Sequence, residues 1–158
     1  MKRLLISCGP IPGRLDSVKY ITNRFKGGLA FRTAEDLALS SDDYEITILK
    51  WRHTEYENHM DFGIVNVDDV YQYYDYIRFN HYDAYILAAA VANLVPSEPF
   101  EGKFPSHNYK VGDKINIEFT IAPRAIDEVK KKFPKSTLIG YKLFDGDEED
   151  LIDAGTKT

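Results

Sequence analysis

Short apolar runs alternate along this chain with segments in which apolar residues recur every three or four positions. The runs at 4–6, 44–51 and 137–143 predict strands, and the longer run at 83–91 is typical of a central parallel strand covered on both faces. Residues 114–121 alternate between apolar and polar, which predicts a half-exposed antiparallel strand. The chain therefore contains several strands of two different kinds.

Helices are predicted between these strands. Apolar positions with a spacing near 3.6 residues predict a helix over about 28–40. Asp68 can cap a second helix over 70–77, because a carboxylate before the first turn accepts hydrogen bonds from free backbone N–H groups. Pro123 suits the first turn of a third helix, and a fourth starts at Glu148.

The alternation of strands and helices implies βαβ units and a three-layer, Rossmann-like α/β sandwich with a mainly parallel sheet. Ligands of such folds bind beyond the carboxyl ends of the parallel strands, so the segments 9–28, 88–103 and 140–146 are expected to meet there. The polar stretch 52–66 is predicted to be a surface loop. Pro96 and Pro99 end the central strand and open a long excursion to Gly112 and Asp113, before the predicted antiparallel strand.

Composition narrows the classes of function. The 158 residues fit a single domain spanning 1–158, and a net charge of −5 argues against bulk attraction to nucleic acid or to a membrane surface. One cysteine excludes an internal disulfide framework. The apolar run near the N-terminus is too short for a signal peptide. No segment of the sequence comes near the roughly 18 consecutive apolar residues of a membrane-spanning helix. We expect a cytoplasmic protein without nucleic-acid or membrane partners.

Several reactive side chains have both a functional and a structural interpretation. Cys8 could be a catalytic thiol, but its place in an apolar strand favours a small buried residue. His53 and His59, with Glu55 and Glu57 between them, could bind a metal, but their spacing favours a solvated loop. Four tyrosines of the second predicted helix fit core packing or, alternatively, a subunit contact: Tyr71, Tyr73, Tyr74 and Tyr76.

The common nucleotide and hydrolase motifs are absent. The sequence contains no Gly-x-Gly-x-x-Gly dinucleotide fingerprint, no Gly-Lys-Ser/Thr phosphate loop and no Gly-x-Ser-x-Gly nucleophile elbow. A stretch from Gly9 through Asn23 instead leads to Lys26, Gly27 and Gly28 at a helix start. Free N–H groups and the helix dipole favour an anion at that point, and Lys26 adds positive charge.

A second stretch, Ala-Ala-Ala-Val-Ala-Asn at 88–93, ends the predicted central strand with small residues, and Lys103 follows ten residues after Asn93. Small side chains at a strand end allow a ligand to lie against the backbone. The two stretches together resemble phosphopantothenoylcysteine synthetases, the synthetase domain of the bifunctional flavoprotein of coenzyme A biosynthesis.

Bacterial members of that family carry Gly-Pro-Thr-Arg-Glu-Pro-Leu-Asp-Pro-Val-Arg-Tyr-Ile-Ser-Asn, to which Gly9–Asn23 is similar in ungapped register. The matching positions are Gly9, Pro10, Leu15, Asp16, Val18, Tyr20, Ile21 and Asn23. They also carry Ala-Ala-Val-Ala-Asp with a functional Lys ten residues later, similar to 89–93 and Lys103 here. The run Ile139-Gly140-Tyr141-Lys142-Leu143 resembles the strand that the family places under the nucleotide base.

The resemblance implies a ligase that activates the carboxylate of 4′-phosphopantothenate with CTP or ATP and Mg²⁺, and then joins it to cysteine through an acyl-nucleotide. It implies that Asn23 holds the pantothenate portion and that Lys103, on a mobile flap over about 96–114, closes on the phosphates; these are the expected catalytic residues. It also implies a homodimer. The expected nucleotide- or substrate-binding residues are Gly9, Lys26, Gly27, Gly28, Ala89, Ala90, Val91, Ala92, Asn93 and Tyr141, with no residue assigned to a metal.

The sequence departs from the family pattern at three places. Phe25-Lys26-Gly27-Gly28 stands where the family usually has Ser-Ser-Gly-Lys, and Asn93 replaces an Asp. The chain is also expected to be shorter than the family after the helix that starts at Glu148. These departures keep open a non-catalytic nucleotide- or phosphopantothenate-binding homologue or regulatory subunit, and a third alternative is a reductase with a divergent dinucleotide site.

Overall fold

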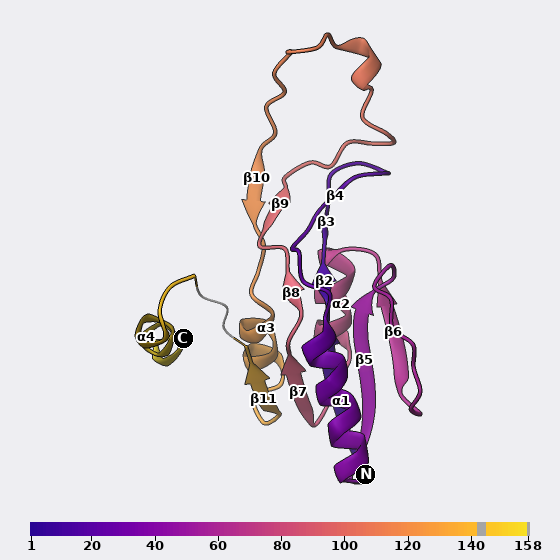
Figure 1. Cartoon of the computed structure of the whole chain (residues 1–158), viewed down its shortest axis with the longest axis vertical. Helices are drawn as coiled ribbons and strands as arrows, with labels where there is room; N and C mark the ends of the chain where they lie inside the picture. The colour runs from indigo at the N-terminus through magenta and orange to yellow at the C-terminus, as the bar shows by residue number, and fades with distance from the viewer. Residues whose placement is uncertain (142–144, 158) are drawn as a thin grey trace.

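A parallel sheet lies at the centre of the computed structural model, which describes residues 1–141 and 145–157 (Figure 1). Its strands follow the order β11-β7-β1-β5-β6, and all neighbours are parallel. This confirms the predicted α/β class with a mainly parallel sheet. The strands are β1 (Lys2–Cys8), β5 (Tyr44–Trp51), β6 (Gly63–Val67), β7 (Ala84–Leu87) and β11 (Thr137–Gly140).

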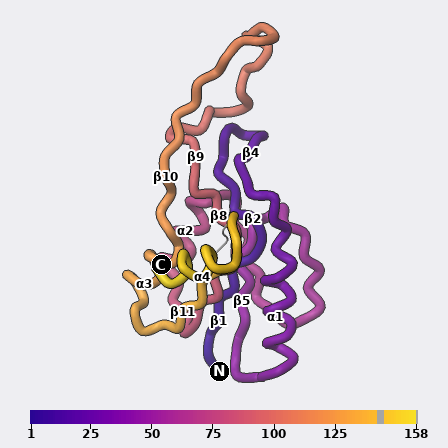
Figure 2. The backbone as a smooth tube through the Cα atoms, turned by 60° about the vertical axis from the view of Figure 1, so that its left-hand side comes forward, coloured from indigo at the N-terminus to yellow at the C-terminus, as the bar shows by residue number. Residues whose placement is uncertain are grey.

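Helices cover both faces of this sheet (Figure 2). Helix α1 (Gly28–Ser40) packs Ala30, Phe31 and Ala34 against Ile6 and Ile48 of the sheet. The opposite face is covered by α2 (Val70–Phe79) and α3 (Ala125–Lys132). The short helices η1 (Ser106–Asn108) and α4 (Glu148–Thr156) lie outside these layers.

The middle strand β1 packs side chains against the helices on both faces of the sheet, because successive side chains along a strand point to opposite faces. Ile6 belongs to the apolar cluster under α1, whereas its neighbour Leu5 belongs to the cluster under α2, with Tyr73 and Ile77. All four side chains are fully buried. Tyr73 and Tyr74 are buried in this core, as the packing interpretation predicts, while Tyr71 is exposed.

The prediction of a loop over 52–66 is wrong at its end. Residues Gly63–Val67 form the edge strand β6, which runs parallel to β5 with Thr47 opposite Gly63 and Trp51 opposite Val67. A short edge strand that begins with glycine and contains a polar Asn66 lacks the apolar continuity from which strands are recognised. Its apolar residues contact the core nevertheless.

The predicted strand over 83–91 is divided in two. Its first part, β7, lies between β1 and β11 as a central strand should. After Leu87 the chain leaves the sheet, and β8 (Ala90–Val91) pairs in parallel with β2 (Pro10–Ile11), which follows β1. Its partner β2 is likewise separated from β1, by Gly9 with a φ of 72°.

Smaller corrections concern element ends. Asp69, not Asp68, caps α2 by accepting a hydrogen bond from Gln72 N at 3.0 Å. Helix α3 starts at Ala125, with Arg124 as N-cap, so Pro123 lies before the helix. Within the predicted strand 114–121, only β10 (Phe119–Ile121) is a strand. The predicted strand 137–143 ends at Gly140, and Lys142 and Leu143 lie outside the described residues.

An extension that we call the arm projects from the carboxyl end of the sheet and consists of residues 13–21 and 94–121 (Figures 1 and 2). The first part is the antiparallel hairpin β3 (Gly13–Arg14) and β4 (Tyr20–Ile21). The second part is the antiparallel pair β9 (Leu94–Pro96) and β10, joined by the flap. An antiparallel strand next to the flap is thereby confirmed. Among the described helices, none has the length and apolar character needed to cross a membrane.

Candidate functional site

Two glycines bring the end of β1 against the start of α1. Gly27 caps α1 with a φ of 84°, and a Cβ on it would lie only 2.6 Å from Gly9 N and 2.7 Å from Gly9 Cα. No side chain caps the helix, and its first turn contains no acidic residue. The N–H groups of Gly28, Leu29 and Ala30 have no acceptor among the described residues. We call Gly9, Gly27 and Gly28 the glycine cradle, and its free donors suit an anion.

Asn23 connects this cradle to the strand end at 89–93. Its Nδ2 donates a hydrogen bond to Ala90 O at 3.0 Å, and Ala90 N donates one to Gly9 O at 2.9 Å. The Oδ1 of Asn23 accepts no hydrogen bond from the described residues, so it remains available to a ligand. Of the three segments predicted to meet, 9–28 and 88–103 therefore come together at Gly9, Asn23 and Ala90, and 140–146 contributes Gly140 and Tyr141 to a pocket shared with 89–93.

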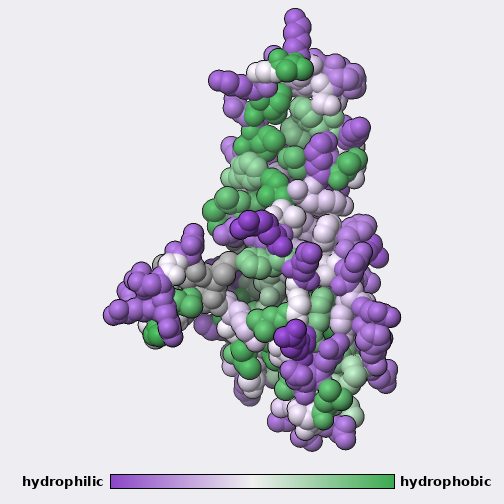
Figure 3. Space-filling model, in the orientation of Figure 1, coloured by the Kyte–Doolittle hydropathy of each residue, from purple (hydrophilic) through white to green (hydrophobic). Residues whose placement is uncertain are grey.

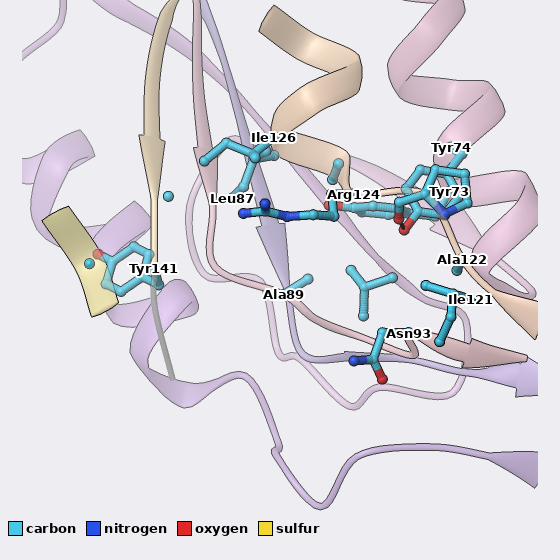
Figure 4. Close-up of a pocket in the computed structure, with 15 residues that line it drawn as sticks. Tyr73, Tyr74, Leu87, Ala89, Asn93, Ile121, Ala122, Arg124, Ile126 and Tyr141 are labelled. Carbon is cyan, nitrogen blue, oxygen red and sulfur yellow. Dashed lines mark hydrogen bonds between the residues drawn. The ribbon is translucent and has the colours of Figure 1, made fainter. Parts of the chain in front are cut away.

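A pocket of about 670 Å³ lies beside the end of β7 (Figure 4). It is lined by four of the residues that the sequence assigned to ligand binding: Ala89, Val91, Asn93 and Tyr141. Its volume lies within the roughly 300–1,000 Å³ of small-molecule sites. Tyr141 is 51% exposed and lies on the side of the pocket away from Tyr73 and Tyr74.

Not every predicted binding residue lines this pocket. Ala92 is buried in the core, and its N–H donates to Ile11 O at 2.9 Å. Ala90 takes part through its backbone, in the contacts to Gly9 and Asn23. Lys26 is exposed before the cradle and has no ion pair with any described residue. The odd-numbered residues of 89–93 thus face the pocket, because a strand alternates its side chains.

The segment before and into α3, which sequence reasoning missed, supplies another wall of the pocket. Arg124 is the N-cap of α3 and extends into the pocket, with its Nε 3.9 Å from Asp127 Oδ2 (Figure 4). Tyr74 donates a hydrogen bond to Pro123 O and so ties α2 to this wall. Pro123 predicted a helix start from the sequence. No sequence pattern predicted that this helix start faces residues 89–93.

A buried cation, Lys50, holds a turn that packs against the cradle, and sequence reasoning missed it. Lys50 at the end of β5 donates hydrogen bonds to Thr54 O at 2.8 Å and to Trp51 O at 3.3 Å, and burial lowers its pKa. The turn that it holds packs Thr54 against Gly9, where a Cβ would lie 3.1 Å from Thr54 Cγ2. Lys50 therefore fixes a neighbour of the cradle.

Cys8 and the histidines take the structural places that the sequence favoured. Cys8 is fully buried in β1, opposite Lys50, and burial raises the pKa of its thiol to about 12. A thiol with this pKa stays protonated at neutral pH, which disfavours a nucleophilic role. His53 and His59 are exposed. Within residues 1–141 and 145–157, no group of three His, Cys, Asp or Glu side chains could hold a metal ion.

Lys103 lies on the arm and does not line the pocket. Its neighbours are attached to the hairpin of β3 and β4: Ser17 N donates to Gly102 O at 2.9 Å, and Phe104 N donates to Asp16 Oδ2 at 2.8 Å. The Lys103 side chain is exposed and forms no ion pair with a described residue. The structure thus joins Asn23 to the cradle through Ala90, and it joins the neighbours of Lys103 to the turn that precedes Asn23.

Comparisons with known proteins agree with this fold over almost the whole chain. The family described as the DNA/pantothenate metabolism flavoprotein C-terminal domain matches residues 1–157. The coenzyme A biosynthesis bifunctional protein CoaBC of Thermococcus kodakarensis is 27% identical over 161 residues, which cover 99% of this chain and 38% of that protein. The chain therefore spans less than half the length of this curated relative.

Solved structures share the fold. The DNA/pantothenate metabolism flavoprotein from Streptococcus pneumoniae superposes with a TM-score of 0.82 at 22% identity, covering 99% of this chain and 76% of that one. A Cab2 mutant in complex with phosphopantothenate-cysteine superposes with a TM-score of 0.75 at 16% identity, covering 99% of this chain and 68% of that one. These similarities and the family match confirm the resemblance drawn from residues 9–23 and 89–103, and the chain belongs to the family of DNA/pantothenate metabolism flavoprotein C-terminal domains.

Proposed function

We propose that this chain is a phosphopantothenoylcysteine synthetase, a ligase that joins 4′-phosphopantothenate to cysteine in coenzyme A biosynthesis. The observation that carries the proposal is the hydrogen bond from Asn23 to Ala90 O, because it joins the two family motifs at the carboxyl end of the sheet. The family match over residues 1–157 and the name of the Thermococcus relative support the same reaction.

The reaction needs activation before bond formation, because a carboxylate is a poor acyl donor. In the proposed first step a carboxylate oxygen of 4′-phosphopantothenate attacks the α-phosphorus of a nucleoside triphosphate, and pyrophosphate leaves. The cysteine amine then attacks the acyl carbon, the nucleoside monophosphate leaves with the bonding electrons, and the amine loses a proton. Both steps depend on positioning and on neutralisation of phosphate charge.

The residues of this site suit those tasks. The free N–H groups at the start of α1 would bind a phosphate at the cradle, and Asn23 would hold the acyl group through Oδ1 and its remaining N–H. The pocket between Ala89, Asn93 and Tyr141 would hold the nucleotide, with Arg124 as a cation at its wall. Lys103 would add its ammonium group to the phosphates.

The nucleotide is proposed to be CTP or ATP, and Mg²⁺ is proposed to enter as part of the nucleotide complex. The donors that this site offers are mainly backbone N–H groups, amides and cations, which suit phosphate oxygens rather than a resident metal. Nucleotide-bound Mg²⁺ would neutralise phosphate charge and so assist departure of pyrophosphate.

The test is an assay of the full chain with 4′-phosphopantothenate, cysteine, Mg²⁺ and either CTP or ATP. We expect pyrophosphate release that needs 4′-phosphopantothenate, and a product whose mass equals that of phosphopantothenoylcysteine. Omission of cysteine should leave the acyl-nucleotide as the end product. Absence of turnover with every nucleotide would overturn the proposal.

A second candidate is a homologue that binds nucleotide or phosphopantothenate without turnover. The favouring observation is the loop before the cradle, where Phe25 and Lys26 are exposed and no side-chain hydroxyl caps α1. Calorimetry that detects binding in a chain without pyrophosphate release would select this candidate. The homodimer expected from the family is proposed for both candidates, and light scattering of the purified chain would test it.

A further inference from the structure

Asp16 is a buried carboxylate in the turn between β3 and β4, and the proposed site has no use for it. Its side chain is fully buried, so its charge needs partners to replace water. Oδ1 accepts hydrogen bonds from Val18 N at 2.7 Å and Lys19 N at 2.6 Å. Oδ2 accepts them from Phe104 N at 2.8 Å and from the Lys19 ammonium group at 2.9 Å. Both oxygens are therefore committed, and one of them reaches the flap.

The contact with Phe104 belongs to a larger junction between the turn 15–19 and the flap. Ser17 N donates to Gly102 O at 2.9 Å, and Phe100 N donates to Leu15 O at 2.8 Å. Phe100 and Phe104 pack edge to face with their ring centroids 4.8 Å apart. The segment 100–104 is thus attached to the turn through backbone, carboxylate and apolar contacts.

Lys103 lies between the two residues that this junction holds. Gly102 is bound through its carbonyl and Phe104 through its N–H, whereas the Lys103 side chain is exposed and has no ion pair among the described residues. The junction consequently fixes the backbone of Lys103 and leaves its ammonium group free. This is the arrangement expected of a cation that is carried to an anionic ligand.

The same turn continues directly to Asn23. Residue Lys19, whose N–H and ammonium group both bind Asp16, is followed by β4 (Tyr20–Ile21) and then by Asn23 at the cradle. Through this short connection, Asp16 links the flap residue Lys103 to the segment that carries Asn23. An independent flap would have no such link.

We propose that Asp16 is a positioning residue that fixes the backbone of Lys103 to the turn 15–19 and so holds Lys103 in a set relation to Asn23. The proposal rests on the proposed function for the role of Lys103 itself. A carboxylate is required because all its neighbours are donors. The amide of Asp16→Asn would direct an N–H group at another donor, either at Val18 and Lys19 or at Phe104.

The first test measures attachment without reference to catalysis. We expect slow hydrogen exchange of the Phe104 amide in the unmodified chain, and exchange about tenfold or more faster in Asp16→Asn, with faster tryptic cleavage after Lys103. Asp113→Asn is the matched control, because Asp113 accepts only the Lys110 N–H at an exposed turn of the arm. Unprotected Phe104 exchange in the unmodified chain would overturn the proposal even if Asp16→Asn failed to fold.

The second test asks whether Asp16 acts through Lys103. Asp16→Asn is expected to lower kcat about tenfold, and the double variant with Lys103→Ala to be no worse than Lys103→Ala alone. Effects that multiply in the double variant would overturn the positioning role. An unmodified chain without turnover would overturn the proposed function and the catalytic part of this inference, while exchange at Phe104 would still decide the attachment.

Discussion

The sheet and the arm are held by different forces. Around the sheet, Ile6 and Ile48 of the strands and Tyr73 of α2 are fully buried, so burial of apolar surface dominates the stability of this region. In the arm, Val111 and Ile121 are exposed, and apolar side chains lie on its surface (Figure 3). The two parts of the arm are joined to each other by hydrogen bonds centred on Asp16, together with the packing of Phe100 against Phe104.

This difference separates the site residues that are held by the packed core from the one that is carried on the arm. The cradle and Asn23 lie at the carboxyl end of the packed sheet, so their geometry follows from the core. Lys103 lies on the arm, and its position depends on the hydrogen bonds of Gly102 and Phe104 and on the packing of Phe100 against Phe104. Changes in the two regions should therefore separate loss of folding from loss of function.

The largest expected effect is that of Gly27→Val in the sheet region. Its Cβ would meet the backbone of Gly9, and the φ of 84° is a conformation that costs an L residue about 1–2 kcal/mol. We expect loss of both turnover and thermal stability. Gly28→Ala is the control for thermal stability, because a Cβ at Gly28 would have open space within 4 Å. An unchanged melting temperature in Gly27→Val would contradict the close approach of the two glycines.

Lys103→Ala should produce the converse pattern in the arm. We expect a fall in kcat of about 100-fold, typical for loss of a cation that stabilises a transition state, with an unchanged urea midpoint. Lys110→Ala removes an equally exposed lysine farther along the arm and should leave kcat unaltered. Equal loss of activity in the two variants would refute a specific role for Lys103.

Asn23→Ala tests the residue that follows the arm hairpin and bonds the strand end at Ala90. We expect turnover to fall strongly and the free energy of unfolding to fall by about 1 kcal/mol, because the hydrogen bond to Ala90 O is lost. The stability change distinguishes Asn23 from Lys103, whose side chain forms no hydrogen bond or ion pair with a described residue. Chemical denaturation together with the pyrophosphate assay measures both quantities. Retention of full activity would remove Asn23 from the site.

The smallest expected effect is the loss, at acid pH, of the stability that the Asp16 carboxylate contributes. Hydrogen bonding from Phe104 N, and then from Lys19 and Val18, holds the pKa of Asp16 well below its usual 3.8. The unfolded chain therefore takes up a proton near that value before the folded chain does, so the stabilisation is complete above pH 3.8 and is lost as the pH falls below it. We expect the difference in urea midpoint between the unmodified chain and Asp16→Asn to be constant from about pH 5 to 7 and to shrink below 3.8. A difference independent of pH would show that the carboxylate charge is not involved.

The elements with clear periodicity could be predicted from the sequence, and those with interrupted patterns could not. The buried runs of β1 and β5 and the helical spacing of α1 are local properties, and each was predicted. Strand β6 was missed, and β8 was assigned to the wrong sheet, because pairing with a distant partner decides both. Arg124 and Lys50 were missed for the same reason, since their positions depend on contacts across the fold.

The sequence by itself determined the α/β class, the family and the candidates Asn23 and Lys103, because these follow from local patterns and motif spacing. The tertiary structure alone decided that Gly27 touches Gly9, that odd-numbered residues of 89–93 line one pocket and that Asp16 reaches Phe104. The physical reason is that a hydrogen bond or a backbone contact requires atoms within a few ångströms. That distance is set by how the chain folds and not by the number of residues between the two positions.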